Sequence, residues 1–235
     1  YAMRKPAKTQ RIALLGGSYQ MGSGVDNDKV FEAIVEERIN KEGGMYLGYA
    51  SCGAFALSNR VVGKMGDVNH LEIFNFAAGG YYLLQQVEMI NTSVFQFDMD
   101  GVIYFAHTDE RGKVVKDFTQ AIKRKQPLKY PFFEYIQIKS GAKPYMSMLQ
   151  INELLTPYAD TIMKWCYKEI ADKCKEHNVT PIWAFMPTTT EDVDMKEYNE
   201  LKAYVETLGF VTLDMRDAYG TIDRKQIQIS EWNTH

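Results

Sequence analysis

Ser18 is the side chain in this sequence that is best placed to act as a nucleophile. It follows an apolar run at residues 11–16 and a second glycine, Gly17. Short apolar runs are typical of buried strands in a parallel sheet, and adjacent glycines permit a tight turn after the strand. The peptide N–H groups that follow can face the oxyanion formed when a hydroxyl attacks an ester carbonyl. The pattern therefore favours acyl transfer through Ser18.

Two other interpretations of this loop stay open. Residues 16–24 are rich in glycine and lie between a predicted strand and a predicted helix, as a phosphate-binding loop would. However, the loop lacks the lysine of G-x-x-x-x-G-K-[ST] and the spacing of G-x-G-x-x-G, which argues against nucleotide binding. Ser18 could also do no more than cap the helix that follows a structural turn.

The elements that must position Ser18 alternate between apolar runs and amphipathic segments. Apolar runs predict strands at residues 11–16, 71–76, 101–106, 181–186 and 210–214. Apolar residues at helical spacing predict helices at residues 27–41, 82–91, 151–177 and 193–208. Such alternation implies an α/β fold, a three-layer doubly wound sheet of about five parallel strands with helices on both faces. In this fold, ligands bind at the carboxyl ends of the strands, where Ser18 stands.

Residues 111–148 form the least regular part of the sequence, because Pro127, Pro131 and Pro144 interrupt it. No linker-like composition flanks this part, so it predicts an irregular insertion or a lid rather than a separate domain. With 235 residues, the chain has the length of one domain, and residues 1–235 are expected to form it.

Four segments together resemble the sequence blocks of the SGNH (GDSL-type) hydrolase family, in the family's order and across almost the whole chain. The first is I-A-L-L-G-G-S-Y-Q-M-G-S-G-V-D at residues 12–26, and the second is N-F-A-A-G-G at residues 75–80. The third is D-G-V-I-Y-F-A-H-T-D at residues 100–109, and the last is W-N-T-H at residues 232–235. The resemblance implies that the chain has a flavodoxin-like sheet and is a divergent member of a family of serine esterases.

The resemblance also implies roles for individual residues. Ser18 would attack the ester carbonyl, and His235 would take its proton and return it to the leaving alcohol. The N–H groups of Ser18 and Gly80 would face the oxyanion, with Gly79 in place of Gly80 if the register shifts by one residue. In the family a final helix follows the histidine, so a further helix is expected after His235.

Three positions depart from the family pattern. Gly17 stands where the family has the aspartate of G-D-S, which supports the turn rather than the reaction. Thr108 stands nearest to the third-block asparagine, an oxyanion donor in the family, and either Thr108 or His107 could donate in its place. Asn233 and Glu231 are equal candidates for orienting the histidine, because the family aspartate is absent there. Losing one oxyanion donor typically costs about 10²–10³ in rate, so a weaker or differently tuned enzyme is expected.

The predicted function is hydrolysis or transfer of an ester. We expect a serine esterase or O-acyl (acetyl) transferase that acts through an acyl-enzyme on a small-molecule or glycan ester, and the resemblance favours a carbohydrate. Tyr81 and Tyr82 could line an acyl or glycan pocket, although core packing explains such residues equally well. His107 could likewise be a packed histidine, and residues 109–111 could form a solvated loop. The alternative from a different class is a non-catalytic binding or scaffold domain that keeps the fold with a degenerate site.

Composition and charge exclude several other classes of function. The formal net charge is -3 and no basic stripe is present, so nucleic acid is not an expected partner. The four histidines are dispersed without H-x-x-x-H or H-E-x-x-H spacing, so neither a metal nor another cofactor is expected. No run approaches the roughly 20 apolar residues of a membrane span. Family analogy favours a periplasmic, secreted or anchored location.

Overall fold

Five parallel strands form one sheet in the computed structural model, which describes residues 3–41, 70–189, 192–220 and 222. The strands are β1 (Thr9–Leu15), β2 (His70–Asn75), β3 (Gly101–Ala106), β4 (Thr180–Phe185) and β5 (Val211–Asp214). Their order across the sheet is β2-β1-β3-β4-β5, and every neighbouring pair is parallel. This is the flavodoxin-like order of doubly wound folds, so the predicted fold class is confirmed.

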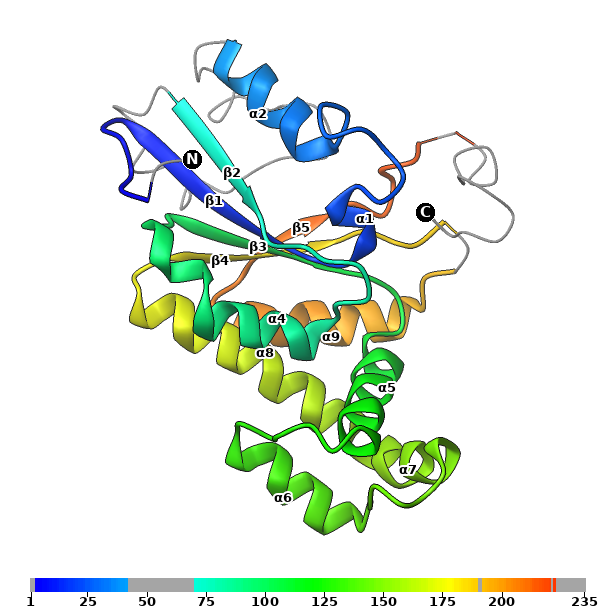
Figure 1. The fold of residues 1–235 in the computed structure, drawn as a ribbon. Helices are drawn as coiled ribbons and strands as arrows, with labels where there is room; N and C mark the ends of the chain where they lie inside the picture. The colour runs from blue at the N-terminus through cyan, green and yellow to red at the C-terminus, as the bar shows by residue number, and fades with distance from the viewer. Residues whose placement is uncertain (1–2, 42–69, 190–191, 221, 223–235) are drawn as a thin grey trace.

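Helices cover both faces of the sheet and give the fold three layers (Figure 1). On one face lies α2 (Phe31–Lys41), which packs on β2. The other face carries α4 (Leu83–Thr92), α8 (Ala159–Glu176) and α9 (Met195–Thr207). A one-turn helix, α1 (Ser18–Met21), follows β1 directly. Among the described residues, no helix is both long enough and apolar enough to cross a membrane.

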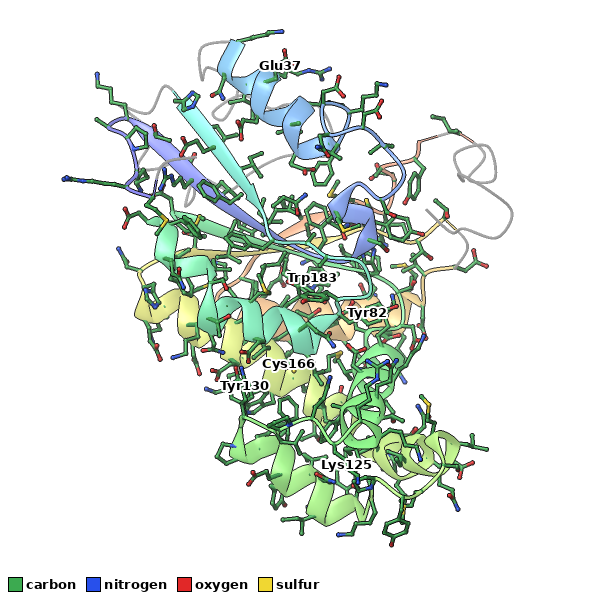
Figure 2. All side chains as sticks on the ribbon, viewed as in Figure 1. Glu37, Tyr82, Lys125, Tyr130, Cys166 and Trp183 are labelled. Atoms are coloured by element: carbon green, nitrogen blue, oxygen red, sulfur yellow. The ribbon has the colours of Figure 1, made fainter. Side chains whose placement is uncertain are left out.

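Alternate residues of β1 point to the two faces of the sheet and enter two separate apolar cores. Ala13 belongs to the larger core under α4, α8 and α9, whereas Ile12 and Leu14 belong to the smaller core on the α2 side. A strand that is buried on both faces needs apolar side chains on both, which is why β1 reads as an apolar run. Trp183 and Cys166, labelled in Figure 2, are fully buried in the larger core.

The segment 111–148 is mostly helical, so the prediction of an irregular insertion is wrong for its local structure. It contains or borders three helices, α5 (Glu110–Lys123), α6 (Pro131–Ser140) and α7 (Met148–Leu155). Pro131 is the first residue of α6, a position where the missing N–H of proline has no cost. Pro127 and Pro144 fall in the connections between helices. The prolines therefore start and separate helices here, and a lid role for the segment stays a prediction.

The long helix predicted at residues 151–177 is instead two helices, α7 and α8. A 3-10 turn at Thr156–Tyr158 separates them, with Pro157 as its central residue. Proline in a helix interior removes one main-chain hydrogen bond, and its ring clashes with the preceding turn. The apolar periodicity continues through this point, but the backbone changes direction.

Arg11 is a cation within β1, and its side chain is fully buried. Its Nε lies 2.6 Å from Oε2 of Glu72, the residue beside it on β2. Its Nη1 donates to the main-chain oxygens of Met3 and Phe97, at 3.0 and 2.8 Å. The guanidinium group also lies 5.1 Å from the ring centre of Phe74. These contacts explain how a buried strand tolerates a charge, because a buried ion needs a partner and further hydrogen bonds.

Candidate active site

Ser18 follows β1 after two glycines and is the first residue of α1, at the edge where the strands of the sheet end. Its side chain is half-buried and lines a cavity of about 240 Å³. Gly17, Gly80, Tyr82 and His107 line the same cavity. Main-chain N–H groups in the first turn of a helix have no acceptor within that helix, so the N–H of Ser18 can serve a ligand. The position matches the rule that ligands bind at the carboxyl ends of parallel strands.

Three amide side chains hold the turn that carries this serine. Gln86 Nε2 donates to the main-chain oxygen of Gly16 at 2.6 Å, and Asn75 Nδ2 donates to that of Gln20 at 2.7 Å. The Gln20 side chain folds back over the turn, and its Oε1 accepts the N–H of Gly17 at 3.1 Å. Gly16 leaves the necessary room, because a Cβ there would lie 2.5–2.8 Å from Gln20 side-chain atoms. The turn is therefore braced from β2, from α4 and from within α1.

Gly80 and Gly79, the two predicted alternatives for the second oxyanion donor, take different positions. Of the two, Gly80 lines the cavity with Ser18. Its backbone is left-handed, with a φ of 75°, which a glycine adopts without strain. The N–H of Gly79 instead faces the sulfur of Met21 at 3.3 Å.

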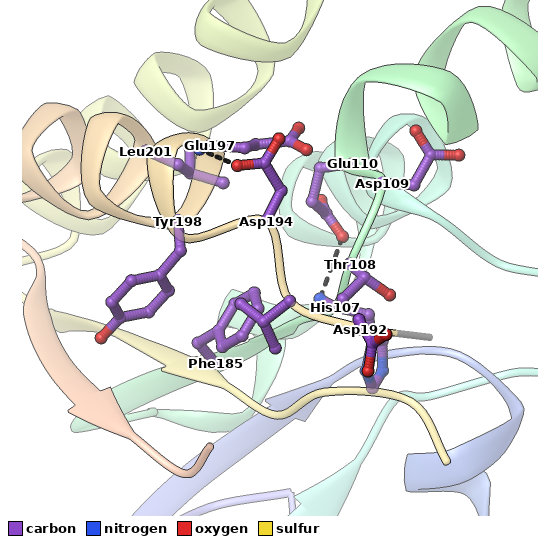
Figure 3. Close-up of a pocket in the computed structure, with 11 residues that line it drawn as sticks. His107, Thr108, Asp109, Glu110, Phe185, Asp192, Asp194, Glu197, Tyr198 and Leu201 are labelled. Carbon is purple, nitrogen blue, oxygen red and sulfur yellow. Dashed lines mark hydrogen bonds between the residues drawn. The ribbon is translucent and has the colours of Figure 1, made fainter. Parts of the chain in front are cut away.

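His107 and Thr108, the two alternatives for the missing asparagine, follow β3 and take different positions. His107 lines the cavity with Ser18 and also a second cavity of about 250 Å³ beside it (Figure 3). Thr108 is buried and lines the second cavity. Both ring nitrogens of His107 face carbonyl oxygens, since Nδ1 is 2.8 Å from Met186 O and Nε2 is 3.2 Å from Gln20 Oε1. The structure thus brings His107 to the cavity of the candidate nucleophile.

Glu110 is buried beside His107, so the alternative of a solvated loop at residues 109–111 is wrong for this residue. Its Oε1 accepts the main-chain N–H of His107 at 3.2 Å, as a dashed line in Figure 3 shows. Its Oε2 accepts the hydroxyls of Tyr104 at 2.8 Å and Tyr167 at 3.1 Å, and Trp183 Nε1 lies 3.3 Å from the Tyr167 oxygen. Burial raises the pKa of Glu110 from its ordinary value, against the opposing effect of a nearby lysine and these hydrogen bonds. The network ties the turn after β3 to the core.

Gln20, Gln86 and Glu110 support the site although the sequence did not single them out. For two of them a signal existed in the helical periodicity. Gln86 shares the buried face of α4 with Leu83, and Glu110 lies one turn before Val114 on the buried face of α5. A polar residue at an apolar position of a helix usually has a specific hydrogen-bonding role. Gln20 lies in a helix of one turn, which is too short to show a period.

His235, Asn233 and Glu231 lie outside the described residues, so their predicted roles stay predictions. Two of the aromatic residues considered for the pocket, Tyr81 and Tyr82, do line the cavity with the candidate nucleophile.

Three carboxylates around the second cavity are engaged within the protein. Asp109 caps α5 by accepting the N–H of Gly112 at 3.0 Å, and Asp194 caps α9 by accepting that of Glu197 at 3.2 Å. Glu197 also pairs with Arg111 at 2.9 Å. In the described part of the chain, no group of three His, Cys, Asp or Glu side chains is arranged to hold a metal ion.

Asp117 lies two turns after Glu110 on the buried face of α5 and makes stability depend on pH. Burial raises the pKa of Asp117 from 3.8 to about 7, and the charge of Glu110 adds to the shift. Between about pH 4 and pH 7, the folded protein therefore holds a proton that the unfolded chain has lost. The stability from this group is fully present below about pH 4 and is lost as the pH rises through 7.

We therefore expect the stability of Asp117→Asn, whose amide cannot ionise, to increase relative to that of the wild type as the pH rises. The free energy of unfolding of the variant minus that of the wild type should increase by on the order of 2 kcal/mol between pH 5 and pH 8, because one pKa unit corresponds to about 1.4 kcal/mol. Urea denaturation at both pH values measures this difference. A difference that is equal at the two pH values would show that Asp117 titrates as an ordinary carboxyl.

Comparison with known proteins gives similarity in structure but not in sequence. No protein-family model matches the sequence, and no curated protein matches it. The structure of TesA matches with a TM-score of 0.51 and 9% identity, over 96% of this chain and 88% of its own. AlinE4, described as an SGNH-hydrolase family esterase, matches with a TM-score of 0.50 and 12% identity, over 96% and 86%. The acetyl xylan esterase AlAXEase matches with a TM-score of 0.50 and 12% identity, over 92% and 82%.

These similarities extend over most of each chain, at sequence identities of 9–12%. At such low identity, the similarity shows a shared fold. The strand order, the coverage of both faces and the matched structures agree. The chain has the three-layer α/β fold of SGNH-hydrolase esterases.

Proposed function

We propose that the protein is a serine ester hydrolase or O-acyl transferase of the SGNH type, which acts through an acyl-enzyme on Ser18. The observation that carries the proposal is the position of Ser18 on a glycine turn, in a cavity at the carboxyl end of β1. Gly80, in the connection between β2 and α4, lines the same cavity. A hydroxyl with main-chain donors close by is the arrangement that acyl transfer requires.

In the proposed reaction, Ser18 Oγ attacks the carbonyl carbon while His235 accepts its proton. The N–H groups of Ser18 and Gly80 stabilise the oxyanion, and the bond to the alcohol breaks as the proton passes to the leaving oxygen. Water, or an acceptor hydroxyl in a transferase, then attacks the acyl-enzyme and gives its proton to His235. The bond between the acyl carbon and Ser18 Oγ breaks as that proton passes from His235 to Ser18, which restores the free enzyme. Asn233 or Glu231 orients the imidazole in this scheme.

The size and lining of the cavity support an acetyl ester of a carbohydrate as the substrate. A cavity of about 240 Å³ is smaller than the range of about 300–1,000 Å³ that is common for small-molecule sites, which favours a short acyl group. Tyr81 is 37% exposed and Tyr82 lies beside it at the cavity. Tyrosine rings offer an apolar face for a sugar ring and a hydroxyl for its polar groups. AlAXEase, which shares the fold, is by its name an acetyl xylan esterase.

A fluorophosphonate probe tests the proposal, because it reacts with activated serine hydroxyls. We expect the full-length protein to gain one adduct, on the peptide that contains Ser18, as located by mass spectrometry. Ser18→Ala should stay unlabelled under the same conditions. An unlabelled wild type, or an adduct that persists in Ser18→Ala, would overturn the proposal.

A non-catalytic binding or scaffold domain is the second candidate, and the position of Thr108 favours it. Thr108 stands in place of an oxyanion donor, yet it lines the second cavity rather than the one with Ser18. A site with fewer donors can still bind an ester without turning it over. Such a protein would behave toward the probe as Ser18→Ala does.

A further inference from the structure

Gln20 and His107 connect the turn that carries Ser18 to the end of β4. Gln20 Oε1 accepts the N–H of Gly17 at 3.1 Å, and the same oxygen lies 3.2 Å from His107 Nε2. His107 Nδ1 lies 2.8 Å from the main-chain oxygen of Met186, the residue that follows β4. These contacts, here named the Gln20–His107 bridge, join the ends of β1, β3 and β4.

The oxygens that face the His107 ring can only accept hydrogen bonds. Neither Gln20 Oε1 nor the carbonyl of Met186 has a proton to give, so a hydrogen bond to either oxygen needs a proton on the ring nitrogen that faces it, and His107 donates in both bonds only as the imidazolium. Reversing the Gln20 amide would remove the acceptor of the Gly17 N–H. Gln20 is fully buried, and a buried polar group that loses its partner costs about 1–3 kcal/mol. The bridge therefore needs a donor at the position of His107 Nε2.

His107 is held firmly enough to act as a support. Its main-chain N–H donates to Glu110, which the hydroxyls of Tyr104 and Tyr167 hold from the core. Its ring packs against Tyr19 with 5.4 Å between ring centres. Groups that position a reacting atom must themselves be fixed by packing and hydrogen bonds.

The orientation of Gly17 depends on contacts from other residues. It directly precedes Ser18 and has the wide conformational freedom of glycine. Its N–H is fixed by Gln20, and Gln20 in turn contacts His107. A change at His107 can therefore reach the Ser18 hydroxyl through two hydrogen bonds.

We propose that Gln20 and His107 are positioning residues that hold Gly17, and through it Ser18, in the orientation needed for attack. The inference rests on the proposed function and extends it. It gives His107 a role that acts through Gln20, instead of direct contact with the oxyanion.

His107→Phe tests the bridge because it keeps a ring against Tyr19 and removes the donor. The rate of fluorophosphonate labelling at Ser18 should fall about 10–100-fold, since a misplacement of 1 Å can cost about 100-fold. His107→Gln carries an amide donor near the position of Nε2 and should restore most of the rate. His177→Phe is the matched control, because the ring of His177 stacks on Phe95 at the opposite end of the sheet. It should label like the wild type.

Gln20→Leu, alone and combined with His107→Phe, separates positioning from contact with the oxyanion. Residues that act through one another give non-additive effects. We expect each single variant to slow labelling, and the double variant to be slowed little beyond the slower of them. If His107→Phe slowed labelling by the same factor in the presence and absence of Gln20, His107 would act on the reacting atoms and not through Gln20. That result would overturn the inference. So would a His107→Phe variant that labels at the wild-type rate, or a His107→Gln variant that does not recover.

Hydrogen exchange at the N–H of Gly17 distinguishes a failure of this inference from a failure of the proposed function. The bond to Gln20 protects this N–H, so exchange should be about 10-fold faster or more in both Gln20→Leu and His107→Phe, and unchanged in His177→Phe. An unreactive wild type would overturn the proposed function alone. An unchanged exchange rate at Gly17 in both variants would overturn the bridge, whatever the probe does.

Discussion

Ser18→Ala should lower kcat for p-nitrophenyl acetate by at least about 10³-fold, since loss of the nucleophile of a serine hydrolase costs up to about 10⁶. The remaining contacts of the site can bind the ester but cannot form the acyl-enzyme. Release of p-nitrophenolate, followed by its absorbance, measures the rate. Because Ser18 is half-buried and loses one hydroxyl, the variant should unfold at the same urea concentration as the wild type.

Ser23→Ala is the matched control for this result. Ser23 lies five residues further along the chain, just after α1, and its main-chain N–H, which the substitution keeps, donates to the main-chain oxygen of Ser18 at 3.1 Å. We expect its kcat to stay close to that of the wild type. If Ser18→Ala kept a tenth or more of the wild-type rate, another group would have to be the nucleophile.

Of the substitutions described here, Glu72→Leu should cause the largest loss of stability, about 3–5 kcal/mol in the free energy of unfolding. Arg11 is fully buried, and the carboxylate of Glu72 at 2.6 Å is its partner ion. Removing the carboxylate takes away the oppositely charged group paired with Arg11 and leaves the buried guanidinium with its charge uncompensated at that position. Arg11→Met combined with Glu72→Leu removes both charges and should cost less than Glu72→Leu alone, because a buried ion pair contributes little net stability. Urea denaturation measures each variant.

Asp26→Asn provides the comparison for an ion pair in solvent. Asp26 and Lys29 are 2.6 Å apart, but their side chains are 73% and 66% exposed. Exposed pairs contribute about 0–1 kcal/mol, so this variant should differ little from the wild type. A Glu72→Leu variant no less stable than Asp26→Asn would show that the Arg11 charge is not confined to the interior.

The sheet could be predicted because buried parallel strands leave a direct mark on the sequence. The strand predicted at residues 71–76 is observed as His70–Asn75, and the one predicted at residues 101–106 is observed as Gly101–Ala106. The helix α6 was missed because its stability comes from contacts distant in sequence. Its Phe133 packs against Trp165 of α8 at 5.0 Å between ring centres. Local periodicity does not record such a contact, whereas the proline at the first position of α6 was a signal available in the sequence.

The candidate site was likewise predictable from the sequence only in part. Ser18, Gly80 and His107 could be brought together from the sequence, because all three follow predicted strands and the carboxyl ends of parallel strands meet. The contact of Gln20 with His107 joins residues 87 positions apart, and it depends on side-chain conformations that no spacing rule gives. The prediction of Thr108 as an alternative donor rested on sequence position alone, and the turn after β3 directs it to the neighbouring cavity.

Trapping the acyl-enzyme tests the central claim most directly. The full-length protein is mixed with p-nitrophenyl acetate, quenched in acid within seconds, digested and analysed by mass spectrometry. The account predicts one acetyl group on the peptide that contains Ser18, which forms with the first turnover, disappears as the substrate is consumed and is absent from Ser18→Ala. Steady release of p-nitrophenolate from the wild type, with no acetyl group on that peptide at any time, would contradict it.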